Sequence, residues 1–294
     1  MKKSKKNILI IGGTGFIGFH LLKKTTKLGW NSFSISKNRP KKNRKVNKVK
    51  YIFLNISNLN KLKKNFLNNY DYIVNLTDIT TSTLFFLKKR NFKKLLHVGS
   101  SAEYGNLRRL PHKENFVCKP ISAYGRKKLS ITKNLLKSFK KKFFPLIIVR
   151  MFQVYGPFDN SNKIIPQVLQ NCLKNRTLKL TAGYQTRDFI YIKDIIDVLM
   201  TSMRLLHKKS MCDHINVGTG VSVSVDELLS IITSITNTDP EIIRKDLPKG
   251  DPERSGGTYE KISDILNMDI NSFYNLKLGL ESTFEYFNNL NSKV

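Results

Sequence analysis

The stretch that decides the fold is NILIIGGTGFIGFHLLKKTTKLGW, residues 7–30. It opens with an apolar run, Ile8 to Ile11, of the kind that forms a buried strand. Apolar residues then recur on one face of a helix, at Ile17, Leu21 and Leu28. The stretch therefore predicts a strand, a turn and a helix, in that order.

Glycines occupy the turn between this strand and this helix, where Gly12, Gly15 and Gly18 form the pattern G-x-x-G-x-x-G. A dinucleotide pyrophosphate needs close approach of the backbone there and the positive end of a helix, and any side chain would push the phosphates away. We therefore predict a dinucleotide site at this turn. Its expected contacts are Gly12, Thr14, Gly15, Phe16, Ile17 and Gly18.

Further segments of the first half of the chain are typical of strands. They lie at 31–36, 50–56, 71–76, 94–100 and 144–152, with lysine-rich helical stretches between most of them. Strands that alternate with helices predict an α/β fold with a doubly wound parallel sheet.

The pattern becomes looser beyond residue 157, where we expect a smaller lobe. We predict a dinucleotide-binding domain over residues 1–157 and a mainly substrate-binding lobe over residues 158–294. The sequence contains no low-complexity linker and no hinge rich in Pro or Gly between the two. They should therefore interleave in one body.

The net charge of the 294-residue chain is +31 at pH 7, which by itself favours nucleic acid or an acidic membrane surface as a partner. The lysines, however, are spread over nearly every segment beside abundant Asn and Ile, and the aromatic residues are not interleaved with basic ones as base-stacking platforms would be. We expect a solvated basic surface that draws anionic small molecules toward a cleft, rather than a nucleic-acid partner.

The longest apolar run, FFPLIIV at 143–149, is far too short to span a bilayer. The basic start of the chain lacks the small-x-small cleavage site of a signal peptide, so we predict a cytoplasmic protein. Cys118, Cys172 and Cys212 are odd in number, widely spaced and without a CxxC pattern. They predict reduced thiols rather than a disulfide framework or a metal site.

The end of the second predicted strand bears on the type of cofactor. Enzymes that use NAD usually carry an acid there, which binds the ribose 2′-hydroxyl, whereas this strand ends in SISKNRP. Ser36, Lys37 and Arg39 would instead suit a 2′-phosphate. We predict NADP, with NAD as the alternative.

The stretch SAYGRKKLS, residues 122–130, places Tyr124 four residues ahead of Lys128. A chain so rich in lysine will contain such a pair by chance, but no other tyrosine here has lysine at this spacing. On a helix the two side chains would lie on one face. The pair becomes informative when its position relative to the other motifs of the chain is considered.

The order of several motifs resembles the extended short-chain dehydrogenase/reductase family, also called the NAD-dependent epimerase/dehydratase family, which acts on nucleotide sugars. Beside the glycine turn and the Tyr-Lys pair, the matching stretches are HVGSSAEYG (97–105), VRMFQVYGP (149–157), QTRDFIYIKD (185–194), INVGTGVSVSVDEL (215–228) and KGDPERS (249–255). They extend over nearly the whole chain. The resemblance implies a Rossmann-like doubly wound parallel sheet with a smaller C-terminal substrate-binding lobe, a nicotinamide cofactor, a nucleoside-diphosphate sugar as substrate and a homodimer.

The resemblance also implies catalytic roles. Tyr124 would exchange a proton with a sugar hydroxyl or ketone while hydride passes to or from the nicotinamide, and Lys128 would stabilise the phenolate. A Ser or Thr of the family hydrogen-bonds the same oxygen, and counting back four positions from Tyr104 selects Ser100, with Ser101 as the alternative.

Substrate contacts follow from the same resemblance. Gln153 stands where relatives often carry an Asn that faces the nucleotide sugar, and Arg187 matches an arginine that binds the diphosphate. Relatives usually have another arginine before the Gly-Asp near the C-terminus, whereas this chain has Lys249 and, further on, Arg254. These two either bind the anion or are surface charges.

The chain departs from the family at two places near the expected cofactor. Asn55 stands where relatives usually have an acid that reads the adenine, although Asn55, Ile56 and Leu76 remain expected cofactor contacts. The loop after the fourth strand, within residues 75–89, is shorter than in relatives. Either the pocket is more open, or the protein has lost ordinary activity.

The reaction type can be narrowed further. Dehydratases of the family place acids directly after the catalytic Ser or Thr, where this chain has Ser101 and Ala102, and Glu103 comes one place late. The short loop and the NADP-like SKNR favour a reductase that exchanges its cofactor. Residues 178–194 resemble reductases that make 3,6-dideoxyhexoses from CDP-linked 4-keto-6-deoxyhexoses. We predict such a reductase, made for surface polysaccharide; the alternatives are a nucleotide-sugar 4-epimerase and a non-catalytic dinucleotide-binding protein.

Overall fold

The structure is a computed structural model that describes residues 5–55, 58, 69–78, 83, 86–87, 91–140, 145–205 and 212–292. The expected cofactor contact Ile56 lies outside the described residues, as does much of the short loop after the fourth strand.

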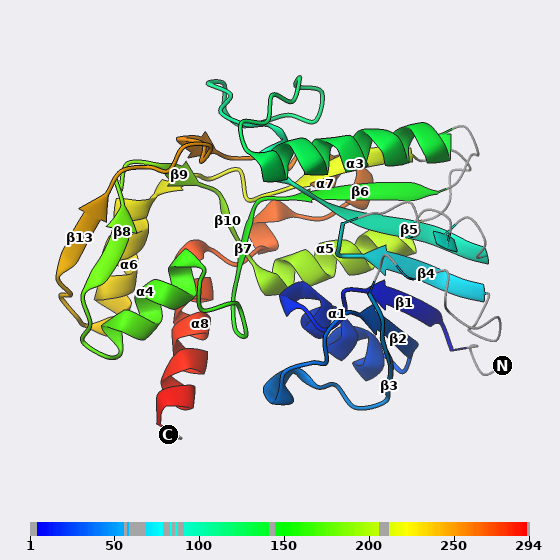
Figure 1. Ribbon diagram of the computed structural model, residues 1–294, viewed down its shortest axis with the longest axis horizontal. Coiled ribbons are helices and arrows are strands. Elements are labelled where there is room, and N and C mark those ends of the chain that lie inside the picture. The colour runs from blue at the N-terminus through cyan, green and yellow to red at the C-terminus, as the bar shows by residue number, and fades with distance from the viewer. Residues whose placement is uncertain are drawn as a thin grey trace. The chain divides into compact units, whose positions relative to one another are not determined.

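The seven-stranded sheet has the strand order β11-β6-β5-β4-β1-β2-β3 (Figure 1). The pairs β1–β2, β1–β4, β2–β3 and β4–β5 are parallel. The strands are β1 (Asn7–Ile11), β2 (Asn31–Ser36), β3 (Val49–Phe53), β4 (Asn69–Asn75), β5 (Asn91–Ser100), β6 (Leu146–Met151) and β11 (Cys212–Val217). The prediction of a Rossmann-like, doubly wound α/β fold is confirmed.

The strand order reverses at β1, which pairs with β2 on one side and with β4 on the other. Ile11, the last residue of β1, is in register with Ile35 of β2 and with Asn75 of β4. In doubly wound sheets, ligands bind outside the carboxyl ends of the strands at such a reversal. The fold therefore places the glycine turn, which follows Ile11, where a ligand is expected.

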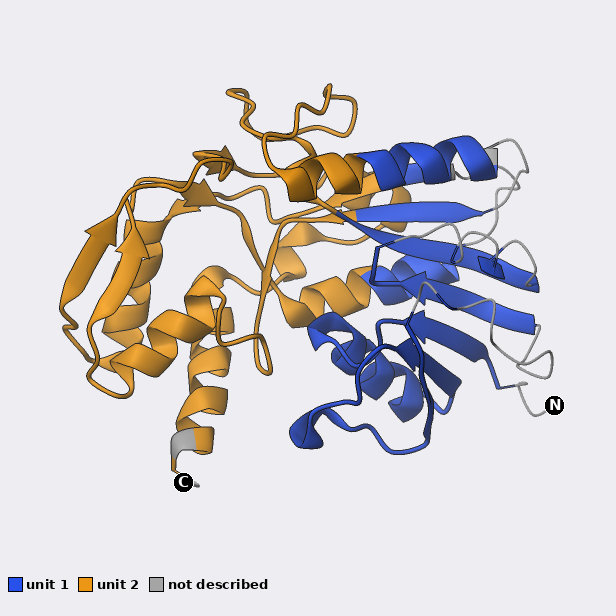
Figure 2. Ribbon diagram, viewed as in Figure 1, with its two compact units in different colours: residues 1–99, 130–149, 199–214 blue, residues 100–129, 150–198, 215–294 orange. Residues whose placement is uncertain are grey.

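The chain divides into two compact units, coloured separately in Figure 2. Unit 1 comprises residues 1–99, 130–149 and 199–214, and unit 2 comprises residues 100–129, 150–198 and 215–294. Each unit is assembled from three separate stretches of chain. The division of cofactor and substrate binding between residues 1–157 and 158–294 stays a prediction.

Unit 1 is built on apolar side chains of the sheet. Helix α1 (Phe16–Lys27) packs on β1 and β2. The second half of α3 (Ala123–Lys140) buries Ile131, Leu135 and Phe139, which are spaced four residues apart and so share one helix face. They join a buried cluster that includes Leu9, Ile11, Phe33, Ile35, Ile73, Leu95, Leu146 and Ile148.

Unit 2 contains short strands and three mutually packed helices, α4 (Ile164–Cys172), α6 (Val225–Thr236) and α8 (Leu276–Asn291). Two further helices are α5 (Ile192–Arg204), which continues into unit 1, and α7 (Glu260–Leu266). The short strands are β7 (Gln153–Tyr155), β8 (Leu178–Thr181), β9 (Thr186–Arg187), β10 (Phe189–Tyr191), β12 (Val223–Ser224), β13 (Ile242–Lys245) and β14 (Arg254–Ser255). They pair as β7–β10, β12–β9–β14 and β8–β13. Among the described residues, no helix has both the length and the apolar character that a bilayer crossing requires.

Candidate active site

The glycine turn after β1 requires its glycines for two different reasons. Gly12 has φ +89°, a conformation that side chains disfavour, and a Cβ on it would lie 2.7 Å from Cγ2 of Thr77. Gly18 lies on the first turn of α1, where a Cβ would collide with the backbone of Gly12 and Gly13. The helix can therefore approach the turn closely only because residue 18 is a glycine.

The N-terminus of α1 is open toward an anion. Its N-cap residue, Gly15, has no side chain to accept a hydrogen bond, and the first helical turn contains no acid. The first N–H groups of a helix have no acceptor within the helix, and the helix dipole favours negative charge at this end. The turn is thus chemically suited to a pyrophosphate.

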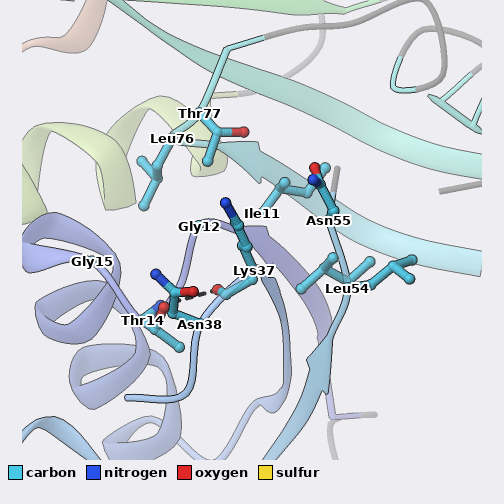
Figure 3. A pocket seen from close by; sticks show the side chains of 12 residues that line it. Ile11, Gly12, Thr14, Gly15, Lys37, Asn38, Leu54, Asn55, Leu76 and Thr77 are labelled. Carbon is cyan, nitrogen blue, oxygen red and sulfur yellow. Dashed lines mark hydrogen bonds between the residues drawn. The ribbon is translucent and has the colours of Figure 1, made fainter. Parts of the chain in front are cut away.

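A pocket of about 340 Å³ opens beside the glycine turn, within unit 1. Figure 3 shows the side chains of Lys37, Asn55 and Thr77, which line this pocket and come from the segments that follow β2, β3 and β4. Its lining residues are Ile11, Gly12, Thr14, Gly15, Ile35, Ser36, Lys37, Asn38, Leu54, Asn55, Leu76 and Thr77. The structure thus brings together seven of the predicted cofactor contacts: Gly12, Thr14, Gly15, Ser36, Lys37, Asn55 and Leu76. Phe16, Ile17, Gly18 and Arg39 do not line the pocket.

Charge in this pocket is of one sign. Among its described lining residues Lys37 is a cation and none is a carboxylate. Oγ of Ser36 accepts a hydrogen bond from the backbone N of Thr14 at 3.2 Å, so this serine holds the glycine turn to β2. The guanidinium carbon of Arg39 lies 5.2 Å from the ring centroid of Phe53, at the end of β3. Lys37 is therefore the cation best placed for an anion bound in the pocket.

Thr77, which was not predicted, is fixed by a buried asparagine at the end of β4. Asn75 is fully buried, and its Nδ2 donates to the carbonyl of Thr77 at 2.8 Å and to Nδ1 of His97 at 2.9 Å. Oγ1 of Thr77 donates to Oδ1 of Asn75 at 2.9 Å. These bonds shape the turn that packs against Gly12.

The predicted catalytic pair lies at the start of α3. Tyr124 is 55% exposed, whereas Lys128 is 6% exposed, and Nζ of Lys128 lies 5.8 Å from the ring centroid of Tyr124. The i, i+4 spacing falls on a helix, so the two side chains share one face. The arrangement presents a phenol to solvent with an ammonium group behind it.

Ser100 ends β5 and opens a single 3₁₀ turn, residues 101–103. Its Oγ accepts a hydrogen bond from the backbone N of Ala102 at 3.2 Å. Because this bond occupies an oxygen lone pair, the hydroxyl proton stays available for another acceptor. Ser101, the alternative, is the first residue of the turn and is half-buried.

Gly125, a residue that was not predicted, brings α3 onto this turn. A Cβ on Gly125 would collide with the carbonyl oxygen of Ala102 and would lie 3.0 Å from Cβ of Pro120. The first turn of α3, which carries Tyr124, therefore packs directly on the turn that carries Ser100. Ser100, Tyr124 and Lys128 all belong to unit 2.

Glu103, at the end of the 3₁₀ turn, is completely buried. Its Oε1 accepts from the backbone N of Ser100 at 3.0 Å, and its Oε2 accepts from Nη2 of Arg150 at 3.0 Å. Both oxygens of this carboxylate therefore already accept hydrogen bonds from the protein.

Two of the predicted diphosphate contacts come from neighbouring short strands. Arg254 on β14 pairs with Thr186 on β9, the residue before Arg187. Nη2 of Arg187 donates to Oδ1 of Asp251 at 2.8 Å, and the Arg187 side chain is 10% exposed. Lys249 is exposed and lies outside both strands. The structure thus places Arg187 and Arg254 on adjacent strands, but Arg254 is in register with Thr186 and Arg187 with Ser255, so their side chains point to opposite faces of the strand pair.

The remaining predicted substrate contact, Gln153, begins β7 and lines a hollow of about 20 Å³, together with Tyr155 and Phe189. Its backbone N donates to the carbonyl of Asp188 at 2.9 Å. The carboxylate of Asp188 accepts from the backbone N of Thr219, Gly220 and Gly257, and burial raises its pKa. Through these hydrogen bonds, Asp188 connects the loop of Thr219 and Gly220 with the segment of Gly257 in unit 2.

Comparisons with known proteins agree with this geometry. The model of the NAD dependent epimerase/dehydratase family matches residues 8–84 and 77–218. CDP-abequose synthase of Salmonella muenchen is 24% identical and aligns over 95% of this chain and 94% of its own length. A putative UDP-glucose 4-epimerase of Methanocaldococcus jannaschii is 25% identical over 97% of this chain and 99% of its own.

Among solved structures, a UDP-glucose 4-epimerase from Thermotoga maritima, determined with UDP-glucose, superposes with a TM-score of 0.86. It is 23% identical, and the match covers 97% of this chain and 99% of the other. A UDP-glucuronic acid 4-epimerase from Bacillus cereus, in complex with UDP-glucuronic acid and NAD, superposes with a TM-score of 0.84 at 24% identity, over 96% of this chain and 99% of the other. These likenesses show a shared fold.

Proposed function

The chain belongs to the NAD-dependent epimerase/dehydratase family, and we propose that it is an oxidoreductase that reduces a nucleoside-diphosphate 4-keto-6-deoxyhexose with NADPH. The observation that carries this proposal is the Tyr124–Lys128 pair at the start of α3, with the ammonium group 5.8 Å from the phenol ring. Ser100 and Tyr124 lie on two turns that pack on each other through Gly125. Proton transfer to a single carbonyl oxygen would require both hydroxyls to reach that oxygen, and the close packing of the two turns supports this.

The residues of the chain would divide the chemistry as follows. A nicotinamide, when bound, would supply the hydride for the carbonyl carbon. Tyr124 gives its phenolic proton to the carbonyl oxygen, so the ketone becomes an alcohol. Ser100 donates a hydrogen bond to the same oxygen, and the charge of Lys128 stabilises the phenolate that remains.

The pocket beside the glycine turn supports a nicotinamide dinucleotide. Gly12 and Gly18 leave room for the backbone to approach a pyrophosphate, and the N-terminus of α1 has no side-chain cap. The absence of carboxylates among the described lining residues, with Lys37 present, supports a 2′-phosphate and therefore NADP.

The turn after β5 argues against a dehydratase. In the expected register, Ser101 and Ala102 stand where acids would be needed, and the nearby Glu103 is consumed by its bonds to Ser100 and Arg150. The match to CDP-abequose synthase over nearly the full length of both chains supports a CDP-linked sugar as a candidate substrate.

A 4-epimerase is the second candidate. Its support is that matching relatives of nearly the same length are named UDP-glucose 4-epimerases. An epimerase would use the same Ser100, Tyr124 and Lys128, since it also moves a proton and a hydride at one sugar carbon. The two reactions differ in the cofactor: a reductase consumes NADPH, whereas an epimerase leaves its cofactor unchanged after each cycle.

One experiment separates the candidates. Purified protein is incubated with NADPH and a panel of nucleoside-diphosphate 4-keto-6-deoxyhexoses that includes a CDP-linked member. The expected result is stoichiometric oxidation of NADPH with at least one of them. Interconversion of ordinary 4-hydroxy sugars without net cofactor consumption would establish the epimerase, and cofactor binding without any turnover would establish a non-catalytic binding protein. We also propose that the protein is a cytoplasmic homodimer that serves the synthesis of surface polysaccharide.

A further inference from the structure

The carboxylate of Glu103 joins the 3₁₀ turn after β5 to β6. One oxygen, Oε1, accepts from the backbone N of Ser100 at 3.0 Å. The other, Oε2, accepts from Nε and Nη2 of Arg150 at 3.3 and 3.0 Å. Both oxygens therefore face donors only, which a carboxylate can satisfy and an amide cannot.

The far side of this link is held by a chain of buried hydrogen bonds. Nη1 of Arg150 donates to the hydroxyl of Tyr104 at 2.7 Å, and this hydroxyl donates to Oδ1 of Asn216 at 2.8 Å. Burial raises the pKa of Tyr104 to about 12, so the phenol remains protonated. Nδ2 of Asn216 donates onward to the carbonyl of His112 at 2.8 Å. Glu103 thus anchors its turn to a rigid network rather than to a mobile side chain.

We propose that Glu103 is a positioning residue, whose carboxylate fixes the backbone of Ser100 and so aims the Ser100 hydroxyl at the oxygen that Tyr124 protonates. This inference rests on the proposed function, because it takes Ser100 as the donor to that oxygen. The reason is geometric. With the N of Ser100 held by Glu103 and its Oγ held by the N of Ala102, the remaining freedom of the hydroxyl is rotation of its proton.

The Glu103→Gln variant tests the link with little change in volume. Its amide must turn the NH₂ group toward either the N–H of Ser100 or the guanidinium of Arg150, so one of the two attachments is lost. We expect kcat to fall about 10-fold to 100-fold, as for a catalytic group that is slightly displaced. The KM of the nucleotide sugar and the Kd of NADPH should stay near wild type.

A double variant shows whether Glu103 acts through Ser100. If it does, adding Glu103→Gln to Ser100→Ala lowers kcat no further than Ser100→Ala alone. Wild-type kcat in Glu103→Gln, or losses that multiply in the double variant, would overturn the proposal.

If the single variant does not fold, Glu103→Gln/Arg150→Met replaces it, because this pair contains no unpaired buried charge. In that background the kcat expected is nearer to wild type, since the amide oxygen is free to face Ser100, and a kcat as low as that of Ser100→Ala would contradict the link.

Glu114→Gln is the matched control in the same unit. Its carboxylate accepts from the N of Asn216 at 2.8 Å and from Oγ1 of Thr258 at 3.3 Å, two groups that lie outside the turn of Ser100. The Glu114→Gln variant should have a lower free energy of unfolding than the wild type, while its kcat stays near the wild-type value. A loss of kcat as large as that in Glu103→Gln would mean that any damage to the buried network suffices, which overturns the specific role of Glu103.

Amide hydrogen exchange tests the same link without any substrate. Exchange over residues 100–104 should accelerate in Glu103→Gln and not in Glu114→Gln, because the Ser100 amide loses its acceptor. Unchanged exchange there would overturn the proposal. Faster exchange in a protein that turns over none of the sugars would contradict the proposed function alone and leave the positioning of Ser100 by Glu103 supported.

Discussion

Arg150 and Glu103 form an ion pair that solvent does not reach: Nη2 of Arg150 lies 3.0 Å from Oε2 of Glu103, and the side chains are 2% and 0% exposed. Burial acts to lower the pKa of the Arg150 guanidinium, but the charge and hydrogen bond of Glu103 together with the nearby Tyr104 and Cys118 outweigh burial, so the pKa is raised. Each charge depends on the other, since neither can be hydrated in the fold.

Arg150→Met should destabilise the protein strongly. It leaves the buried carboxylate of Glu103 without its counter-charge, and breaking such a pair costs about 3 to 5 kcal/mol of unfolding free energy. Urea denaturation measures this loss. In Glu103→Gln/Arg150→Met both charges are absent, so part of the stability should return. A loss below about 1 kcal/mol in the single variant would mean that water reaches the pair, contrary to its burial here.

Tyr124→Phe should lower turnover by several orders of magnitude, since it removes the proton donor. Stability and NADPH affinity should remain near wild type, because the ring is 55% exposed and only its hydroxyl is lost. Steady-state kinetics and calorimetric titration of NADPH check the two halves. A variant that keeps more than about a tenth of the wild-type rate would exclude Tyr124 as the proton donor.

The glycine turn and the Tyr124–Lys128 pair could be predicted from the sequence because both are local patterns. A strand followed by spaced glycines, and two residues one helical turn apart, carry their geometry in their spacing. The six strands expected in the first half of the chain also appear in the sheet, because their apolar runs are long enough to be recognised.

The partner of Glu103 could not be predicted in the same way. Arg150 lies 47 residues further along, and the two meet because β5 and β6 are neighbours in the sheet. Likewise, the pairing of β9 with β14, which sets Arg254 opposite Thr186, could not be predicted, because strands of two residues are too short to leave a periodic signal. Thr77 and Asn38 were missed because each merely follows a strand end, with no motif of its own.

Lys37→Ala should weaken NADPH binding relative to NADH. The charged side chain lines the pocket, and losing a charged hydrogen bond to a 2′-phosphate should narrow the difference in binding free energy by roughly 1 to 3 kcal/mol. Arg39→Ala tests the other predicted cation by the same calorimetry. Lys45→Ala is the control, since it removes an equal, exposed charge outside the pocket lining and should leave the difference unchanged. Equal affinity of the wild-type protein for both cofactors would refute the NADP assignment.

Gly125→Ala separates packing from helix propensity. Alanine favours a helix interior over glycine by about 1 kcal/mol, so without a clash the variant would be more stable. A Cβ here, however, collides with the carbonyl of Ala102, so we expect lower stability together with a reduced kcat, because the turns that carry Ser100 and Tyr124 must separate. Ser130→Ala, at an exposed position of the same helix, should raise stability slightly through helix propensity and leave kcat unchanged. A more stable and fully active Gly125→Ala would show that the close approach is not needed.

Lys94 on β5 is buried against the end of a helix. It is 2% exposed, and its Nζ donates to the carbonyl of Ser202 at 3.0 Å and to that of Leu205 at 2.8 Å. Ser202 belongs to the last turn of α5, whose final carbonyls have no partner within the helix, and Leu205 is the residue that follows α5. Burial lowers the pKa of Lys94 from 10.5 to about 8.

Stability should therefore depend on pH through Lys94. Between about pH 8 and pH 10.5 the unfolded chain holds the lysine proton and the native state does not, so the unfolding free energy contributed by this group rises with pH. Lys94→Met has no such titration. The wild-type value minus the variant value, from urea denaturation at pH 7, 8, 9 and 10, should increase by up to about 3 kcal/mol, and other titrating groups cancel in the difference. A difference that stays constant over this range would mean that the ammonium group keeps its ordinary pKa and is hydrated in the native state.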